Sequence, residues 1–439
     1  MSSHTSERKT VSLLTATCIV VANMIGTGVF TSLGFQVRDI QSGFTLLFLW
    51  VMGGVFAVCG ALVYGELGAA MPRSGGEYCY LSHIYHPVVG FLSGWVSVTV
   101  GFTAPIAASA MALGAYFSSV IPLLPPLAIA LFVVFGVSLI HAKNMVLGSY
   151  FQQIFTVVKV ILIIILIACG LIFAEPQHLK FLPSTTDLSL IFSSPFAISL
   201  VYVTYSYSGW NAAIYLASEV EEPEKNIPRS LIIGTLIVTA LYLLLNFIFL
   251  HSTPIEKLAG ELEVGYIAAN HIFGSQGAKI MGLLISFGLI SSISSMVLAG
   301  PRVTQVIGED IPIFNILAKK NTNGIPLYAL LLQLFIVTIL LITSSFEAII
   351  TYLGFTLTLS SFMTVLGVFI HRLRDPQLPR PYQTWGYPIT PIVFLLISLW
   401  TLIFLLLSKP MESFAGIGTL AIGLIIYYLG AKNKFKLNS

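Results

Sequence analysis

The chain has 439 residues, of which 56% are hydrophobic and only 9% are charged. A soluble globular protein usually carries about 25% charged residues, so this composition excludes a mainly soluble protein. The mean hydropathy of +0.92 predicts that most of the chain lies in a lipid bilayer. The net charge of +3 gives no reason to expect a nucleic-acid partner.

Twelve apolar stretches are long enough to cross a bilayer as helices, for which about 18 residues suffice. In chain order they are 11–36, 43–70, 87–118, 122–141, 146–174, 190–218, 229–251, 277–306, 325–344, 347–371, 387–408 and 413–431. We therefore predict an all-α membrane protein with 12 transmembrane helices and short tails at residues 1–9 and 432–439. The first stretch is full-length and no small-residue cleavage site follows it, so we expect no cleaved signal peptide.

The basic residues of the loops and tails are unevenly divided between the two sides. Fifteen fall on the side of the termini, and five fall on the other side: Arg38, Lys180, Lys257, Lys279 and Lys409. Loops that stay in the cytoplasm carry such an excess of Lys and Arg. Both termini are thus expected to be cytoplasmic, in a multi-pass protein of the plasma or inner membrane.

Two of the twelve stretches are interrupted by glycine and polar residues. The interruptions are residues 23–28 (NMIGTG) in the first stretch and 205–211 (YSYSGWN) in the sixth. Irregular backbone at membrane depth is tolerated where it is buried in protein or lines a polar cavity. Two such breaks, five spans apart, are typical of transporters with a substrate site near the bilayer midplane. An alternative left open is that the glycines merely allow close helix packing.

The spacing of the breaks also predicts an internal repeat. A unit with an odd number of spans inserts upside down when it occurs a second time. We expect a first five-helix repeat at 10–174 and a second, inverted one at 188–372. Two further helices follow at 386–431.

The breaks suggest what the cavity binds. A half-helix that begins near Gly28 points free N–H groups and a positive dipole at the cavity, which suits a carboxylate. Gly26 and Gly28 lack a Cβ, so a ligand can approach the backbone, and Thr27 adds a hydroxyl. A half-helix that ends near Tyr205 offers carbonyls to an ammonium group. The predicted ligand is an α-amino acid, which carries both charges.

Four stretches resemble the amino acid–polyamine–organocation (APC) superfamily, and most closely its L-type (LAT-like) amino-acid transporters. They are 26–30 (GTGVF), 64–78 (YGELGAAMPRSGGEY), 155–159 (FTVVK) and 207–228, which includes YSGWN and EVEEPEKNIP. The resemblance implies a LeuT-like 5+5 inverted repeat, with broken helices 1 and 6, that works by alternating access.

The resemblance also implies roles for residues of the two breaks. Ile25, Gly26, Thr27 and Gly28 are similar to the carboxylate-binding break of these transporters. Tyr205 matches the aromatic gate that closes over the substrate from outside. Gly209 borders the side-chain pocket, and the remaining candidates of the second break are Ser206, Ser208 and Asn211. Phe249 lies where these transporters often have Tyr, which argues against a hydroxyl link between spans one and seven.

Lys159 is a basic residue deep inside an apolar stretch. Either interface is roughly 20 Å away at 1.5 Å per residue, too far for its side chain to reach, so its ammonium group must face the protein interior. In L-type transporters a similar lysine occupies the place where sodium-coupled relatives bind Na⁺. Sodium-independent transport is expected, with Lys159 as the coupling residue.

Other roles for Lys159 remain open at this stage. It can simply fix its own helix, and a lysine that gains and loses a proton would instead make the protein a proton-coupled symporter. Hydroxyl ligands for Na⁺ are conceivable among Ser291, Ser292, Ser294 and Ser295, although serines in membrane helices more often bond to backbone.

The substrate is expected to be a neutral L-amino acid, because the centres of spans one, three, six, eight and ten carry no charged residue. Tyr205, Tyr207 and Trp210 leave a cationic amino acid or polyamine as an alternative. The expected activity is exchange, and an amino-acid sensor is the non-transport alternative. No catalytic constellation predicts an enzyme, and no cofactor is implied.

Partners and structural anchors follow from a few further residues. Cys18, Cys59, Cys79 and Cys169 have no metal-type spacing, so no metal site is expected. No cysteine lies in the outer loop 118–126, so we expect no disulfide-linked heavy subunit; a homodimer stays open. Glu66 is interpreted as an anchor for the following loop, paired with Arg73.

Overall fold

The computed structural model describes residues 11–72, 75–143, 145–311, 314–322 and 324–437. These residues form helices joined by loops, with one isolated β-bridge between Val11 and Val220. The first half contains α1 Leu13–Met24, α2 Gly28–Gln36, α3 Gly43–Ala70, α4 Glu77–Ile84, α5 Pro87–Val96, the π-helix η1 Ser97–Gly101, α6 Thr103–Val120, α7 Pro126–Lys143 and α8 Met145–Phe173. The second half contains α9 Thr185–Ile191, α10 Ser194–Tyr207, the 3₁₀ helix η2 Ala212–Glu219, α11 Pro223–Ser252, α12 Ile255–Leu258, α13 Val264–Asp310, α14 Asn315–Ala318, α15 Leu327–Thr343, α16 Phe346–Arg374, α17 Ile389–Ser408 and α18 Pro410–Leu437.

The number of apolar helices agrees with a multi-pass membrane protein. Within the described residues, ten helical segments are long and apolar enough to cross a bilayer, and eleven if the bent pair at 185–219 counts as one span. Helix α15 is apolar but has 17 residues, shorter than a usual span. At the C-terminus, α18 continues through residues 432–437 of the predicted tail.

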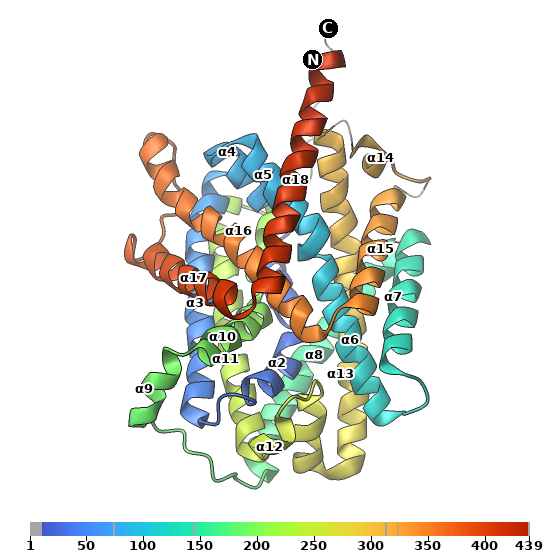
Figure 1. Cartoon of the computed structure of the whole chain (residues 1–439), viewed down its shortest axis with the longest axis vertical. Coiled ribbons are helices and arrows are strands. Elements are labelled where there is room, and N and C mark those ends of the chain that lie inside the picture. Colours follow the sequence, from blue (N-terminus) through green and yellow to red (C-terminus); the bar gives the residue numbers. More distant parts are fainter. Residues whose placement is uncertain (1–10, 73–74, 144, 312–313, 323, 438–439) are drawn as a thin grey trace.

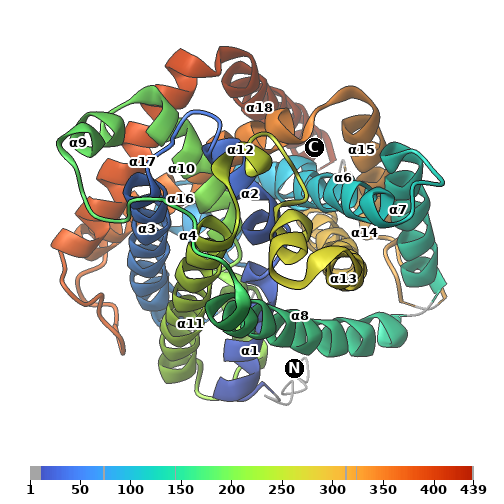
Figure 2. The ribbon, with the colours of Figure 1, turned by 90° about the horizontal axis from the view of Figure 1, so that it is seen from below.

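The helices form a bundle with the broken segments near its centre (Figures 1 and 2). Helix α3 packs against α11, and α6 packs against α13. Figure 2 shows α7, α8, α15, α17 and α18 around the outside. Large apolar side chains are exposed along these outer helices, as a lipid-facing surface requires. The C-terminal end of α18 lies at one end of the molecule, and α9 and α12 lie at the other (Figure 1).

Both helix breaks lie where the sequence predicts them. Helix α1 ends at Met24 and α2 begins at Gly28, while α10 ends at Tyr207 and η2 begins at Ala212. The breaks lie against each other because α2 packs on α10.

The Glu66 carboxylate is bound by residues that lie far from it in the sequence. Its buried carboxylate accepts two hydrogen bonds from the Arg372 guanidinium, at 2.8 and 2.7 Å. It also accepts hydrogen bonds from the Thr384 N–H and hydroxyl, at 2.8 and 2.7 Å. Arg73 lies outside the described residues. Glu66 therefore fastens α3 to the end of α16 and the segment after it, because a buried carboxylate needs a charged partner that reaches it in the fold.

Candidate functional site

A small cavity of about 30 Å³ lies between the two breaks. Its lining comes from α1, α2, α6, α10 and α13, and from the loops at the breaks. The lining residues are Ala22, Asn23, Met24, Gly26, Thr27, Gly28, Pro105, Ser109, Tyr205, Ser206, Ser208, Ser292, Ser295 and Met296. None of these side chains is charged, and six of the fourteen residues are serine or threonine.

The first break presents the N-terminus of α2 to the cavity. Ile25 leaves the helical conformation (ψ 87°) although its N–H still bonds to the Val21 carbonyl. The Thr27 side chain does not cap α2; its hydroxyl oxygen lies 2.6 Å from that of Ser109. The first N–H groups of a helix have no partner within that helix, so the start of α2 is available to an anionic group.

Gly26 and Gly28 play different parts in this break. A Cβ on Gly26 would have no neighbour closer than 4.0 Å, so this backbone faces open space. A Cβ on Gly28 would lie 2.5 Å from the Ser206 Cα. Gly28 is thus needed for the close packing of α2 on α10, which was the alternative considered for both glycines. Gly26 is the position where a ligand can reach the backbone.

The second break turns at a glycine. Gly209 has φ +99°, a conformation that glycine adopts without strain, and a Cβ there would lie 2.8 Å from the Asn23 backbone. Ser208 N–H bonds to the Tyr205 carbonyl, which ends α10. Asn211 directly precedes η2, and its carbonyl accepts a hydrogen bond from the Ile214 N–H at 3.1 Å. Gly209 and Asn211 therefore shape the break and do not line the cavity.

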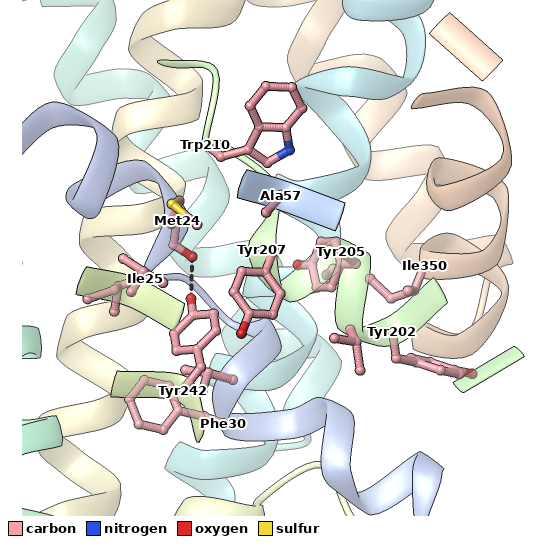
Figure 3. Close-up of a cluster of buried hydrophobic side chains, with 14 of the residues drawn as sticks. Met24, Ile25, Phe30, Ala57, Tyr202, Tyr205, Tyr207, Trp210, Tyr242 and Ile350 are labelled. Carbon is pink, nitrogen blue, oxygen red and sulfur yellow. Dashed lines mark hydrogen bonds between the residues drawn. The ribbon is translucent and has the colours of Figure 1, made fainter. Parts of the chain in front are cut away.

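A tyrosine of span seven ties the two breaks together. The Tyr242 hydroxyl of α11 donates to the Met24 carbonyl at 2.6 Å and lies 3.1 Å from the Ser206 carbonyl. Figure 3 shows this hydroxyl pointing at Met24, with Tyr207 beside it. The expectation drawn from Phe249 was wrong: a hydroxyl link between spans one and seven exists, and Tyr242, two turns before Phe249 on the same helix, provides it.

Lys159 reaches the first break from α8. Its ammonium group donates to the Ile25 carbonyl at 2.8 Å and to the Ser292 hydroxyl at 3.1 Å, and the side chain is only 4% exposed. Gly288 of α13 gives its stem room, since a Cβ there would lie 2.9 Å from the Lys159 Cγ. The ammonium group thus joins α1 to α13 beside the cavity without lining it.

Span three approaches the cavity through an irregular helix. The π-helix Ser97–Gly101 separates α5 from α6, and the Phe102 N–H bonds to the Ser97 carbonyl at 3.0 Å. Pro105, which has no N–H to donate, lies in the first turn of α6 and lines the cavity. π-Helical turns occur frequently at functional sites. Here the irregular turn places Pro105 and Ser109 opposite the breaks.

Aromatic and hydrogen-bond contacts pack α2 against its neighbours beyond the first break. Phe35 of α2 stacks between Tyr202 and Phe346, with ring centroids 5.2 and 5.5 Å apart. The Tyr116 hydroxyl donates to the Phe30 carbonyl at 2.7 Å and accepts from the Gly265 N–H at 2.9 Å. These contacts join α2, α6, α10, α13 and α16 on that side of the site.

Most of the predicted substrate-binding residues line the cavity, and three do not. Gly26, Thr27, Gly28, Tyr205, Ser206 and Ser208 line the cavity, whereas Ile25, Gly209 and Asn211 do not. Ile25 contributes its carbonyl to Lys159 instead. Sequence reasoning did not include Ala22, Asn23, Met24, Pro105 and Met296 among the binding residues. A proline inside an apolar span is the one signal among these that stands out in the sequence.

A helical membrane protein with an uncharged, polar cavity between paired helix breaks has the architecture of a solute permease. The chain matches the sequence model of the family described as amino acid permease over residues 11–431. It belongs to this amino acid permease family.

Several curated relatives match nearly the whole chain. The large neutral amino acids transporter small subunit 2 of Mus musculus is 26% identical over 96% of this chain and 81% of its own length. The b(0,+)-type amino acid transporter 1 of Mus musculus is 28% identical over 98% of this chain and 90% of its own. The serine/threonine exchanger SteT of Bacillus subtilis is 29% identical over 98% of this chain and 99% of its own.

Proposed function

We propose that this protein is a sodium-independent exchanger of small neutral L-amino acids. The observation that carries the proposal is the cavity itself, which has no charged lining residue and lies at the N-terminus of α2 and the C-terminal end of α10. The α2 N-terminus suits a carboxylate and the α10 carbonyls suit an ammonium group. The relatives named as transporters of neutral amino acids and as a serine/threonine exchanger support this reading.

The polar lining favours a small side chain. The hydroxyls of Thr27, Ser109, Ser292 and Ser295 border the cavity, and hydroxyls satisfy a polar substrate better than a long apolar one. Met296 and Pro105 supply its apolar wall. Serine, threonine and alanine fit this combination of size and polarity.

Sodium independence rests on Lys159. Its ammonium group already occupies the position between the Ile25 carbonyl and the Ser292 hydroxyl, two oxygens that a bound Na⁺ would otherwise use. A cation placed beside this fixed charge would be repelled. Lys159 therefore takes the structural place of a coupling ion.

Alternating access requires the cavity to open to each side in turn. We propose that the chain forms 12 spans, with α15 as the ninth, arranged as a LeuT-like inverted repeat of residues 10–174 and 188–372, followed by 386–431. With both termini in the cytoplasm, the present conformation opens inward, and Tyr205 with the Phe35 stack forms the outer closure. The absence of cysteine in loop 118–126 supports transport without a disulfide-linked subunit.

The test is uptake of labelled L-serine and L-alanine into proteoliposomes, with and without unlabelled amino acid inside. We expect uptake to require the internal amino acid and to ignore both added Na⁺ and an imposed proton gradient. Uptake into empty vesicles that follows the proton gradient would replace exchange by proton symport, and stimulation by Na⁺ would contradict the role given to Lys159. L-Arginine serves as the matched cationic substrate, and preferential uptake of it would overturn the neutral specificity.

A further inference from the structure

A second cluster of ligand-type side chains lies far from the cavity, where α4 packs against the end of α16. His83 comes from α4, His371 from the last turn of α16, and Asp375 directly follows α16. One donor atom from each of the three side chains lies within 4.8 Å of the other two. None of these residues lines the cavity, and the proposed exchange cycle does not use them.

His371 has no hydrogen-bond partner within the described part of the chain. Its side chain is only 1% exposed, yet neither Nδ1 nor Nε2 forms a hydrogen bond. A buried polar group left without a partner destabilises the folded state, and such a group in a folded protein calls for an explanation such as a bound ion. The His371 ring thus indicates a ligand.

The geometry of the other two groups suits the same ligand. The His83 and His371 rings are 6.1 Å apart between centroids, at 69° to each other. His371 and Asp375 lie one helical turn apart on the same face, and the Asp375 N–H bonds to the His371 carbonyl at 3.0 Å. His83 is exposed, so an ion reaches the cluster from water, and rotation of its side chain can close the donor set.

The donor set selects the kind of ion. Two imidazole nitrogens and one carboxylate suit Zn²⁺ and related transition metals, whereas Mg²⁺ and Ca²⁺ require mainly oxygen ligands. Three protein ligands leave a fourth position for water.

The arginines next to the cluster already have hydrogen-bond or ion-pair partners. Arg380 donates to the carbonyls of His371 and Asp375 at 3.1 and 2.8 Å. Arg374 donates to the Ile84 carbonyl at 3.3 Å, and Arg372 is paired with Glu66. These guanidinium groups hold the turn around the cluster, and their charge limits the affinity to a moderate value.

We propose that His83, His371 and Asp375 bind a divalent transition-metal ion, Zn²⁺ in the first instance, and that this ion fastens α4 to α16. The two helices already meet through the Tyr85 hydroxyl, which donates to the Met363 carbonyl at 2.8 Å. They also meet through Ser360, which donates to the buried Glu77 carboxylate at 2.6 Å. An ion adds a link at the outer end of this contact. On the proposed exchange function, a tighter link between α4 and α16 slows the transport cycle.

The binding test uses the purified full chain in detergent, with any polyhistidine tag removed and the protein treated with chelator. Titration calorimetry with ZnCl₂ should show one ion per chain with a Kd on the order of micromolar, and Zn²⁺ should raise the thermal unfolding temperature. His83→Ala should weaken binding at least tenfold and remove the thermal shift. His178→Ala, a change at another exposed histidine, is the matched control and should leave both unchanged, and MgCl₂ should have no effect.

Two further variants protect the test against misfolding. His371→Ala changes a buried residue, so Asp375→Asn, which keeps the shape of the side chain but removes its charge, is measured beside it and should also weaken binding. No saturable Zn²⁺ binding at low micromolar concentration, or equal binding by the wild type and His83→Ala, would overturn the site. Zn²⁺ binding is measured without a transport assay, so a failure of the metal site can be distinguished from a failure of the proposed exchange function. If Zn²⁺ binds but leaves exchange in proteoliposomes unchanged, the slowing of the cycle is wrong and the site remains.

Discussion

Gly26 and Gly28 are two positions apart in one loop, yet they meet different surroundings. Gly28 lies against the backbone of Ser206, whereas a side-chain carbon added at Gly26 would find no atom closer than 4.0 Å. The sequence pattern marks both as special without telling them apart. Their difference depends on which residue of α10 lies opposite, which is a property of the folded chain.

The two glycines should respond differently to substitution. Gly26→Val should raise the KM for L-serine at least tenfold, since the new side chain occupies the cavity, and should leave the thermal unfolding temperature unchanged. Gly28→Ala should lower the free energy of unfolding by about 1–3 kcal/mol, because the added carbon overpacks α2 against α10. Uptake kinetics and thermal unfolding in detergent measure the two effects. Gly136→Ala, at a helical glycine with nothing within 4 Å of the added carbon, is the control. It should neither raise the KM for L-serine nor lower the free energy of unfolding. Equal loss of stability at Gly26 and Gly28 would contradict this division of roles.

At the scale of elements, the two broken spans are held by groups from unbroken helices. Tyr242 of α11 bonds to the carbonyl at the end of α1, and Lys159 of α8 bonds to the next carbonyl along. The sequence identified Lys159 because a lysine far from both interfaces stands out in an apolar span. It did not identify Tyr242, because a tyrosine does not stand out in such helices. The resemblance to L-type transporters also placed the matching position at Phe249. Arg372 was not identified as a partner of Glu66 for a similar reason: proximity in sequence does not reveal a partner on a distant helix.

The hydroxyl of Tyr242 can be removed with little change in shape. Tyr242→Phe should lower the free energy of unfolding by about 1–3 kcal/mol, because the buried Met24 carbonyl loses its partner, and should reduce the exchange rate. Thermal unfolding and serine exchange are the measurements. Tyr428→Phe, at an exposed tyrosine of α18, is the matched control. Wild-type stability and rate in Tyr242→Phe would show that the link between spans one, six and seven is dispensable.

At the scale of the whole molecule, the aromatic stack of Phe35, Tyr202 and Phe346 packs α2, α10 and α16 together on the side of the breaks that we propose to be closed. Composition was sufficient to predict a helical membrane protein, and the paired breaks were sufficient to predict where a central cavity forms. The pattern of apolar residues could not show which end is closed. That depends on side-chain stacking between α2, α10 and α16, and one sequence is compatible with both states of the cycle.

The open end can be located by labelling. Asn23→Cys, in a variant with Cys18, Cys59, Cys79 and Cys169 replaced by Ser, should react with a membrane-impermeant maleimide from the cytoplasmic side. Excess L-serine should slow the reaction, because Asn23 lines the cavity. Ser32→Cys in the same background is the control, since Ser32 is fully buried on the closed side of the break, and it should react slowly from either side. Faster labelling of Asn23→Cys from outside would reverse the assigned orientation.

Both supports of the first break bond to main-chain oxygens, those of Met24 and Ile25. Every amino acid carries such an oxygen, so the support does not depend on which side chains occupy these two positions. Related sequences are therefore free to vary residue 24, which lines the cavity, and residue 25 beside it, while the same tyrosine and lysine continue to hold the break in place. Substrate preference in such a protein can change over evolutionary time by single substitutions, without rebuilding the framework that moves the substrate.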